Sequence, residues 1–136
     1  MSRPHYDWWV NAIRMIRNYP ARKQEHDDIT AQAVTADLSG MPHGGGGAGR
    51  TTEMAALREM APAKQAEYDA VRKAIDITRL LPNGEIRLQL IRKVYWGEKH
   101  QSIDSVVYDL YISQQTARNW HRGFVYLVGE CFGYVL

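Results

Sequence analysis

Hydrogen-bonding side chains are concentrated in one short segment near the C-terminus of the chain. The segment contains Ser113, Gln114, Gln115, Arg118, Asn119 and Arg122. The amide of a glutamine can pair with the edge of adenine, and the guanidinium of an arginine can reach guanine or a phosphate. Gln114, Gln115 and Arg118 are therefore candidates for contacts with bases, and Asn119 and Arg122 for contacts with bases or backbone. The chemistry available to this segment is recognition of nucleic acid by hydrogen bonds.

The spacing of these residues places them on a helix. Ser113 can cap the start of that helix by accepting a hydrogen bond from a first-turn backbone N–H. Ser113 and the first-turn amides also suit a phosphate group. Gln114, Arg118 and Arg122 recur every four residues and so share one face. The other faces carry residues that can pack against the protein: Ala117, Trp120 and Phe124. A capped helix of this kind can lie in the major groove of DNA.

A shorter helix precedes this segment and would fix its position. Ser102 can cap a helix over Ile103–Leu110, and Tyr111 then makes the turn. This order is that of a helix-turn-helix, whose second helix reads DNA. Val107 stands where alanine is usual and Tyr111 where glycine is usual, because a positive φ is cheap only without a Cβ. We expect either a turn slightly different from the usual one, or two helices that the larger side chains hold further apart. Lys99, in the loop before the first helix, is a candidate for contact with the DNA backbone.

The N-terminal part of the chain also has helical periodicity, and no segment shows sustained strand alternation. The apolar spacing predicts a helix over residues 6–19 that ends or kinks at Asn18-Tyr19-Pro20, because the residue before a proline is pushed away from helical dihedrals. A second, more polar helix is expected over about Ala21–Leu38. We therefore predict an all-α fold, with N-terminal helices followed by a C-terminal helix-turn-helix at about 102–124.

The middle of the chain begins with a glycine-rich segment at about 39–50, which predicts a flexible linker. We therefore expect an N-terminal helical arm over 1–50 and a helical domain over 51–136. Thr51 or Thr52 can cap the next helix. Pro62 predicts either a kink or the start of a new helix, because proline is tolerated only in the first turn. The helical pattern then continues to Leu80.

The segment Leu81–Gly84 stops that helix, and a further helix is expected over Glu85–Tyr95. Its inward residues should be Ile86, Leu90, Ile91 and Val94. A loop over Trp96–His100 leads to the helix-turn-helix. The apolar run Phe124–Leu136 should pack against the 85–95 helix or contact another subunit. Tryptophans are expected as core or interface anchors at four positions: Trp8, Trp9, Trp96 and Trp120.

Two other kinds of site are disfavoured by the residues that they would need. The glycines at 44–49 have the spacing of a phosphate-binding loop, but Arg50 stands where lysine belongs and no strand precedes them. The five histidines are scattered and give no repeated metal-ligand spacing with Cys131 or a carboxylate. No serine, histidine and acid combination supports nucleophilic catalysis. We therefore expect neither an enzyme, nor a cofactor, nor a metal.

Composition limits the class of protein further. The chain has 136 residues and a net charge of only +2, with 45% hydrophobic residues, which is ordinary globular usage. Weak basicity opposes tight DNA binding by a single subunit. We therefore expect a homo-oligomer in which the helix-turn-helix segments of several subunits bind one DNA site. No run approaches the roughly 20 apolar residues of a membrane span. The start of the chain lacks the apolar core of a signal peptide, which predicts a cytoplasmic protein.

Several motifs resemble a known family. The segment from Leu80-Leu81-Pro82-Asn83-Gly84 to Trp120 resembles the promoter-reading domain of sigma factors. The whole chain is similar to small phage and prophage transcription regulators of the RinA/ArpU type. The matching features are Asn18-Tyr19-Pro20, Met41-Pro42-His43-Gly44-Gly45, Val94-Tyr95-Trp96-Gly97 and the segment Ser113–Phe124. The resemblance implies an activator or regulator of phage genes in a bacterial host cell, which binds double-stranded promoter DNA and contacts RNA polymerase.

Two rival functions use the same residues differently. A DNA-packaging component similar to a small terminase subunit would also carry a helix-turn-helix, but on a ring-forming helical stem. A module that acts only on RNA polymerase would keep the helix-turn-helix as a scaffold. The oligomer separates the first rival from a regulator, because a closed ring indicates packaging and a dimer or tetramer indicates regulation. Loss of DNA affinity on changing Gln114 or Arg118 would exclude the second.

Overall fold

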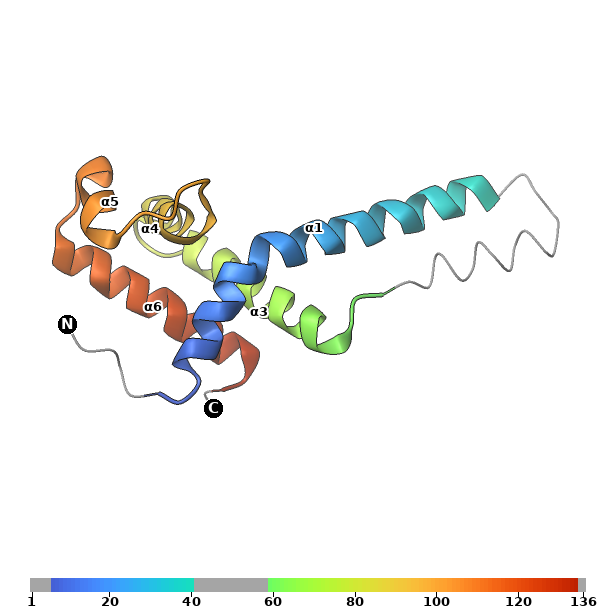
Figure 1. Ribbon diagram of the computed structural model, residues 1–136, viewed down its shortest axis with the longest axis horizontal. Coiled ribbons are helices and arrows are strands. Elements are labelled where there is room, and N and C mark those ends of the chain that lie inside the picture. The colour runs from blue at the N-terminus through green and yellow to red at the C-terminus, as the bar shows by residue number, and fades with distance from the viewer. Residues whose placement is uncertain (1–5, 41–58, 135–136) are drawn as a thin grey trace.

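The computed structural model describes residues 6–40 and 59–134, and these residues are helical with no β-strand (Figure 1). The predicted all-α fold class is therefore confirmed. The elements, in chain order, are α1 (Trp9–Gly40), α3 (Pro62–Arg79), α4 (Gly84–Ile91), the π-helical turn η1 (Arg92–Trp96), α5 (Ile103–Leu110) and α6 (Gln114–Phe132). The predicted glycine-rich linker and the helix that would begin at Thr51 or Thr52 lie outside the described residues.

Helix α1 runs through Pro20, so the prediction that a helix ends there is wrong and the predicted kink is what occurs. Figure 1 shows the axis of α1 changing direction between its dark blue start, which lies against the body, and its lighter continuation, which projects away. Proline has no N–H, so the carbonyl of Ile16, four residues earlier, loses its helical donor. The indole Nε1 of Trp96 donates to that carbonyl at 2.6 Å. A side chain 80 residues away therefore supplies the missing hydrogen bond.

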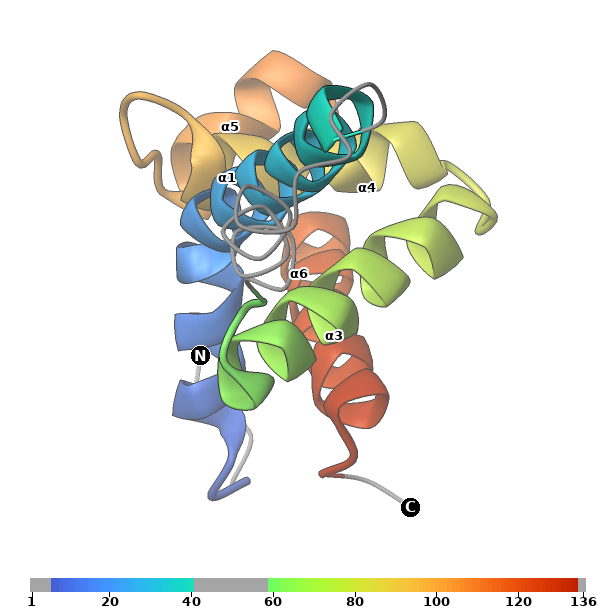
Figure 2. The same ribbon diagram turned by 90° about the vertical axis from the view of Figure 1, so that its right-hand side faces the viewer.

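The main core lies where the first part of α1, helix α3 and helix α6 meet (Figure 2). Its fully buried side chains include Met15 and Ile16 from α1, Val71 from α3, and Val125 and Val128 from α6. These positions follow the helical spacing of apolar residues, so each helix buries one stripe. The start of α1 thus belongs to the same core as the C-terminal helices.

The apolar end of the chain packs within the subunit, mainly against α3 and α1, whereas the sequence predicted packing against the 85–95 helix or against another subunit. Helix α6 contacts α3 and α1 as well as α4. Gly129 makes one of these contacts possible, because a Cβ at that position would lie 2.4 Å from the indole of Trp8. Burial raises the pKa of the Cys131 thiol on the same helix. Val135 and Leu136 lie outside the described residues.

A tight corner joins α3 to α4. Helix α3 begins at Pro62, as one sequence alternative predicted, and ends at Arg79. Asn83 adopts a left-handed conformation with φ 59°. Gly84 begins the next helix, and a Cβ there would lie 2.4 Å from the Thr78 carbonyl oxygen, so only glycine fits. The predicted stop at residues 81–84 is therefore a corner set by close backbone approach.

The helix predicted over Glu85–Tyr95 is α4 continued by η1. Leu90 and Ile91 are buried as expected, whereas Ile86 and Val94 are only partly buried. Two further residues, Leu88 and Tyr95, are buried and were not predicted to point inward. The wider turn of η1 shifts the inward face from Val94 to Tyr95, which spacing for a regular helix does not predict. Ile86 and Leu88 precede this turn, so it does not account for them. No stretch of helix within the described residues combines the length and apolar character that a bilayer span requires.

Candidate nucleic-acid interface

Helices α5 and α6 are joined by a three-residue connection, and both begin with the predicted serine cap. The Ser102 hydroxyl accepts from the backbone N–H of Ser105 at 3.2 Å, and the Ser113 hydroxyl accepts from that of Thr116 at 3.0 Å. Each bond satisfies a donor that a helix start leaves without a partner. The order of helix, short turn and capped second helix agrees with the sequence prediction.

A small second core holds these two helices together. Its buried members are Leu90, Val106, Val107 and Ala117, and Ile112 and Trp120 pack against it. Val107, which stands where alanine is usual, is accommodated with only 6% of its surface exposed. The start of α6 is therefore carried on α4 and α5 as one rigid unit, a requirement for any surface that must match a ligand.

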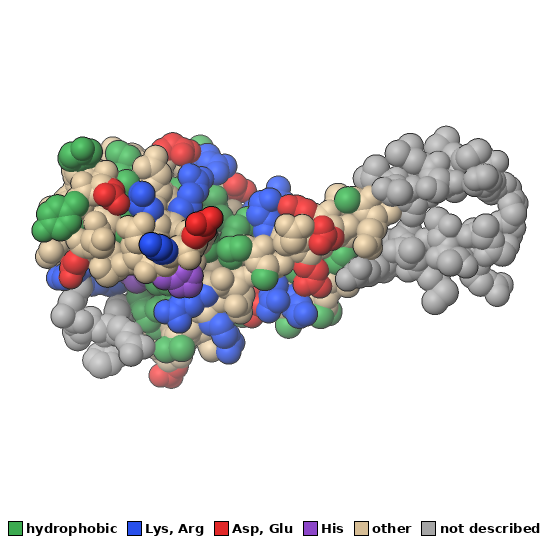
Figure 3. Space-filling view, turned by 45° about the horizontal axis from the view of Figure 1, so that its top comes forward, with side chains coloured by type: hydrophobic (Ala, Val, Ile, Leu, Met, Phe, Trp, Pro, Cys, Tyr) green, Lys and Arg blue, Asp and Glu red, His purple; other side chains and the backbone are tan. Residues whose placement is uncertain are grey.

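The turn itself is made by Tyr111 in the left-handed conformation, with φ 56°. Glycine is usual in such a turn because a Cβ makes a positive φ costly. The Tyr111 side chain is 95% exposed, so burial does not offset that cost. Tyr108, on α5, is also largely exposed. Hydrophobic side chains, in green, are visible at this end of the body in Figure 3.

The polar side chains of α6 lie at the surface, and several of them contact neighbouring side chains. Gln114 is exposed, and the Gln115 amide nitrogen donates to Asn119 Oδ1 at 3.0 Å. The Arg118 guanidinium lies 3.4 Å from a carboxylate oxygen of Asp104 on α5. Its side chain stays 36% exposed, and Arg122 is partly buried. None of these side chains is sealed inside the subunit.

Ser113 has a more restricted role than the sequence suggested. Its hydroxyl accepts from the Thr116 amide and donates to Thr116 Oγ1 at 2.9 Å. The hydroxyl is therefore committed to the cap, and a phosphate at this end of α6 would meet the first-turn backbone amides instead. Ser113 orients the helix start more than it offers a contact of its own.

Aromatic residues fix α6 against α4 and η1. The Arg87 guanidinium lies over the Trp120 ring, 5.0 Å from its centroid, and Arg87 Nε donates to the Pro82 carbonyl at 3.0 Å. The Tyr95 hydroxyl lies 2.6 Å from His121 Nε2. Burial, and to a smaller extent the nearby Arg122, lowers the pKa of His121. His121 is therefore a packing residue that stays neutral at pH 7.

Lys99 lies apart from the α6 side chains, in an exposed loop that borders a groove of about 690 Å³. The groove runs between this loop, η1 and the bend of α1. It brings together Lys99, Arg92, Lys93 and Lys23, of which the sequence reasoning had selected only Lys99. The adjacent cations at 92 and 93 were a signal in the sequence. Lys23 was not predictable, because it comes from a helix whose path depends on the bend at Pro20.

Acidic residues slightly outnumber basic ones in the α5–α6 unit. Residues 102–132 contain three carboxylates and two guanidiniums: Asp104, Asp109, Glu130, Arg118 and Arg122. Asp104 pairs with Arg118, and Asp109 pairs with Lys93 of η1. Figure 3 shows basic and acidic side chains interspersed over the body. The described His, Cys, Asp and Glu side chains form no group of three that could hold a metal ion. Recognition at this surface would therefore rely on hydrogen bonds more than on a strong field.

Comparisons of the chain with protein-family models, with curated proteins and with solved structures return no match. The resemblance to RinA/ArpU-type regulators therefore stays a prediction from the sequence.

Proposed function

We propose that this protein is a sequence-specific DNA-binding transcriptional regulator, an activator of phage or prophage genes, that reads promoter DNA with α6. One observation carries the proposal. A serine-capped helix presents Gln114, Gln115, Arg118 and Asn119 at the surface while its opposite face is anchored on α5. Glutamine, asparagine and arginine are the side chains that pair with adenine and guanine edges in the major groove.

The contacts within α6 are compatible with this function because they are weak and exposed. The Arg118–Asp104 pair lies at the surface, where such pairs contribute only about 0–1 kcal/mol. The bond between Gln115 and Asn119 is also exposed. These two interactions limit the positions of the side chains of α6. Because each interaction is weak, it can be replaced by a contact between the same side chain and a base.

Selection of bound duplexes from a random DNA pool at 100 mM KCl, a condition of roughly physiological screening, tests the proposal. We expect one sequence to be enriched. Gln114→Ala and Arg118→Ala should each weaken binding to it by about 5–150-fold, the effect of about 1–3 kcal/mol per base contact. Lys64→Ala, at the exposed start of α3, is the control for loss of a charge elsewhere. Unchanged affinity in both α6 variants, with circular dichroism like that of the wild type, would overturn the proposal.

Two exposed tyrosines favour a second contact, with a protein partner, on the α5–α6 unit. Tyr108 is 78% exposed and Tyr111 almost fully so, close to the turn before α6. Exposed aromatic side chains are enriched at protein interfaces. A protein partner such as RNA polymerase could use them while α6 holds DNA. Tyr108→Ser should then leave DNA binding intact and reduce transcription from a promoter that contains the selected site.

The mass of the protein in solution distinguishes the regulator from a packaging component. A dimer or tetramer agrees with a regulator that binds paired half-sites. A large closed ring would instead favour the small-terminase-like function.

A further inference from the structure

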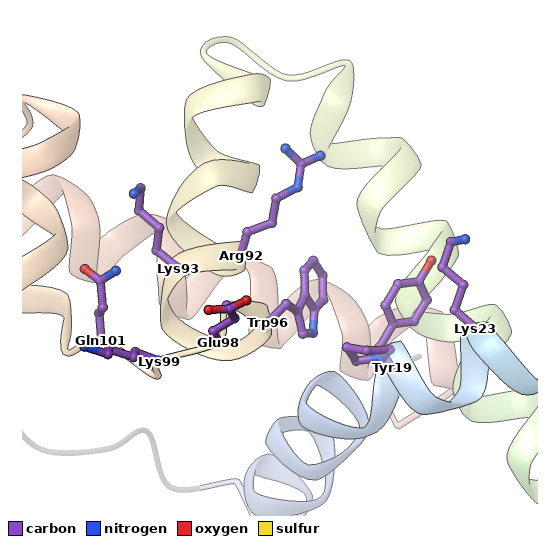
Figure 4. Close-up of a pocket in the computed structure, with 10 residues that line it drawn as sticks. Tyr19, Lys23, Arg92, Lys93, Trp96, Glu98, Lys99 and Gln101 are labelled. Atoms are coloured by element: carbon purple, nitrogen blue, oxygen red, sulfur yellow. The ribbon is translucent and has the colours of Figure 1, made fainter.

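The groove beside α1 has an apolar floor and a basic rim. Tyr19 and Pro20 from α1 and Trp96 from η1 form the floor. Figure 4 shows the charged ends of Lys23, Arg92 and Lys93 pointing to the same side of the groove, with Trp96 between them. Burial raises the pKa of Tyr19, so its hydroxyl stays protonated at neutral pH and can donate a hydrogen bond.

The rim carries an excess of positive charge. Four cations face the groove against a single carboxylate, Glu98. Lys23 is paired with Asp27 at 2.9 Å, and Lys93 lies 3.8 Å from Asp109. Among the described residues, Arg92 and Lys99 have no carboxylate within ion-pair distance. Because apolar walls have a low dielectric constant, they strengthen the electric field of the positive rim, and this field attracts an anion into the groove.

The groove adjoins the head that carries α6. Lys99 and Gln101, on the rim, come just before Ser102, which caps α5. Asp104, in the first turn of α5, contacts Arg118 of α6. Lys93 on the rim contacts Asp109 of α5. Ion pairs therefore connect the basic rim to α5 and α5 to the polar face of α6.

We propose that this groove binds the phosphate backbone of the duplex whose bases α6 reads, so that α1 and η1 extend the DNA contact beyond the helix-turn-helix. The inference rests on the proposed function and adds a source of positive charge, which the α5–α6 unit lacks. That unit has three acidic residues and only two basic ones, whereas affinity for DNA comes largely from cations that displace counterions from phosphates. Arg92 and Lys99 are the principal phosphate ligands, and Lys23 and Lys93 exchange their carboxylate partners for the backbone.

The test compares the full chain with the double variant Arg92→Gln/Lys99→Gln, and with Lys64→Gln as a matched control. Affinity is measured for the selected duplex and for a scrambled duplex of the same length between 50 and 300 mM KCl, a range that spans physiological screening. Each lost phosphate contact lowers the salt slope by about 0.9, so the double variant should lose about 2. Both duplexes should weaken by the same factor, about 10-fold at the lowest salt, because phosphates carry no sequence information.

Each outcome bears on one proposal at a time. If wild-type protein binds DNA through Gln114 and Arg118 but the double variant keeps its affinity and salt slope, the groove proposal fails and the regulator proposal stands. If the wild type prefers no duplex sequence but the double variant loses affinity and slope, the groove is a phosphate-binding surface for duplex DNA of any sequence, and the regulator proposal fails. A second arm titrates ATP and inorganic pyrophosphate. Micromolar binding that the double variant abolishes, with unchanged DNA binding, would identify a small phosphorylated ligand and overturn the groove proposal.

Discussion

At the level of single residues, Asp104 is the side chain that would most directly oppose the proposed DNA binding by α6. Its carboxylate lies 3.4 Å from the Arg118 guanidinium and would repel an approaching phosphate. Asp104→Asn removes this charge and keeps the shape of the side chain. We expect affinity for the selected duplex to rise several-fold, and α5 to lose about 0.3–1 kcal/mol of helix-dipole stabilisation. Fluorescence anisotropy at fixed salt measures the first effect, and weaker binding would contradict it.

Tyr111 provides a test of backbone strain at the turn. A left-handed conformation costs a non-glycine residue about 1–2 kcal/mol, and this side chain buries almost nothing in return. Tyr111→Gly should therefore raise Tm by a few degrees. Tyr108→Gly is the matched control, because the same change inside helix α5 should destabilise the protein by about 1 kcal/mol. Thermal unfolding followed by circular dichroism compares the two, and a lower Tm for Tyr111→Gly would show that the turn is not strained.

His121 makes stability depend on pH. Its pKa is lowered in the folded protein, so the unfolded chain binds a proton more readily as the pH falls below about 6.5, the usual pKa of histidine. Neutral His121 therefore makes its full contribution to the stability of the folded protein above that pH. The contribution is lost as the pH falls toward the pKa of His121 in the folded state. We expect the urea midpoint to fall between pH 7 and pH 5, and to fall less in His121→Gln, which can still hydrogen-bond to Tyr95. Equal pH dependence in both proteins would contradict this role.

At the scale of the elements, local signals predicted the caps but not the path of α1. Ser102 and Ser113 satisfy donors within the next three residues, so the sequence contains everything that fixes those helix starts. Pro20 lies within a helix because Trp96, far away in sequence, supplies a donor to Ile16. A tertiary partner of this kind cannot be read from local spacing. The groove was missed for the same reason, since it exists only where the bend of α1 meets η1.

A double-mutant cycle tests this account of α1. Trp96→Phe removes the indole donor and should cost about 1–3 kcal/mol, because it leaves the Ile16 carbonyl without a partner. Pro20→Ala restores a backbone N–H that can donate to the same carbonyl. Trp96→Phe should therefore cost at least about 1 kcal/mol less in the Pro20→Ala background. Urea unfolding of the four proteins measures the difference, and simple additivity would show that the two residues act independently.

For the whole molecule, the distribution of charge over the surface tells more about possible DNA binding than the net charge does. The value of +2 led us to expect an oligomer, and that expectation stays a prediction. The fold adds a local basic groove beside the α5–α6 unit, which carries little net charge. The main body and the second core are joined through α4, η1 and α6, which belong to or contact both.

Whether α6 reads DNA is tested by comparing wild-type, Gln114→Ala and Arg118→Ala proteins. Their affinities are measured for the selected duplex and for its single-base variants at one stated salt concentration. We expect each variant to lose discrimination at particular base pairs, while binding to scrambled DNA changes much less. If both variants keep the wild-type preference at every base pair, α6 does not read DNA.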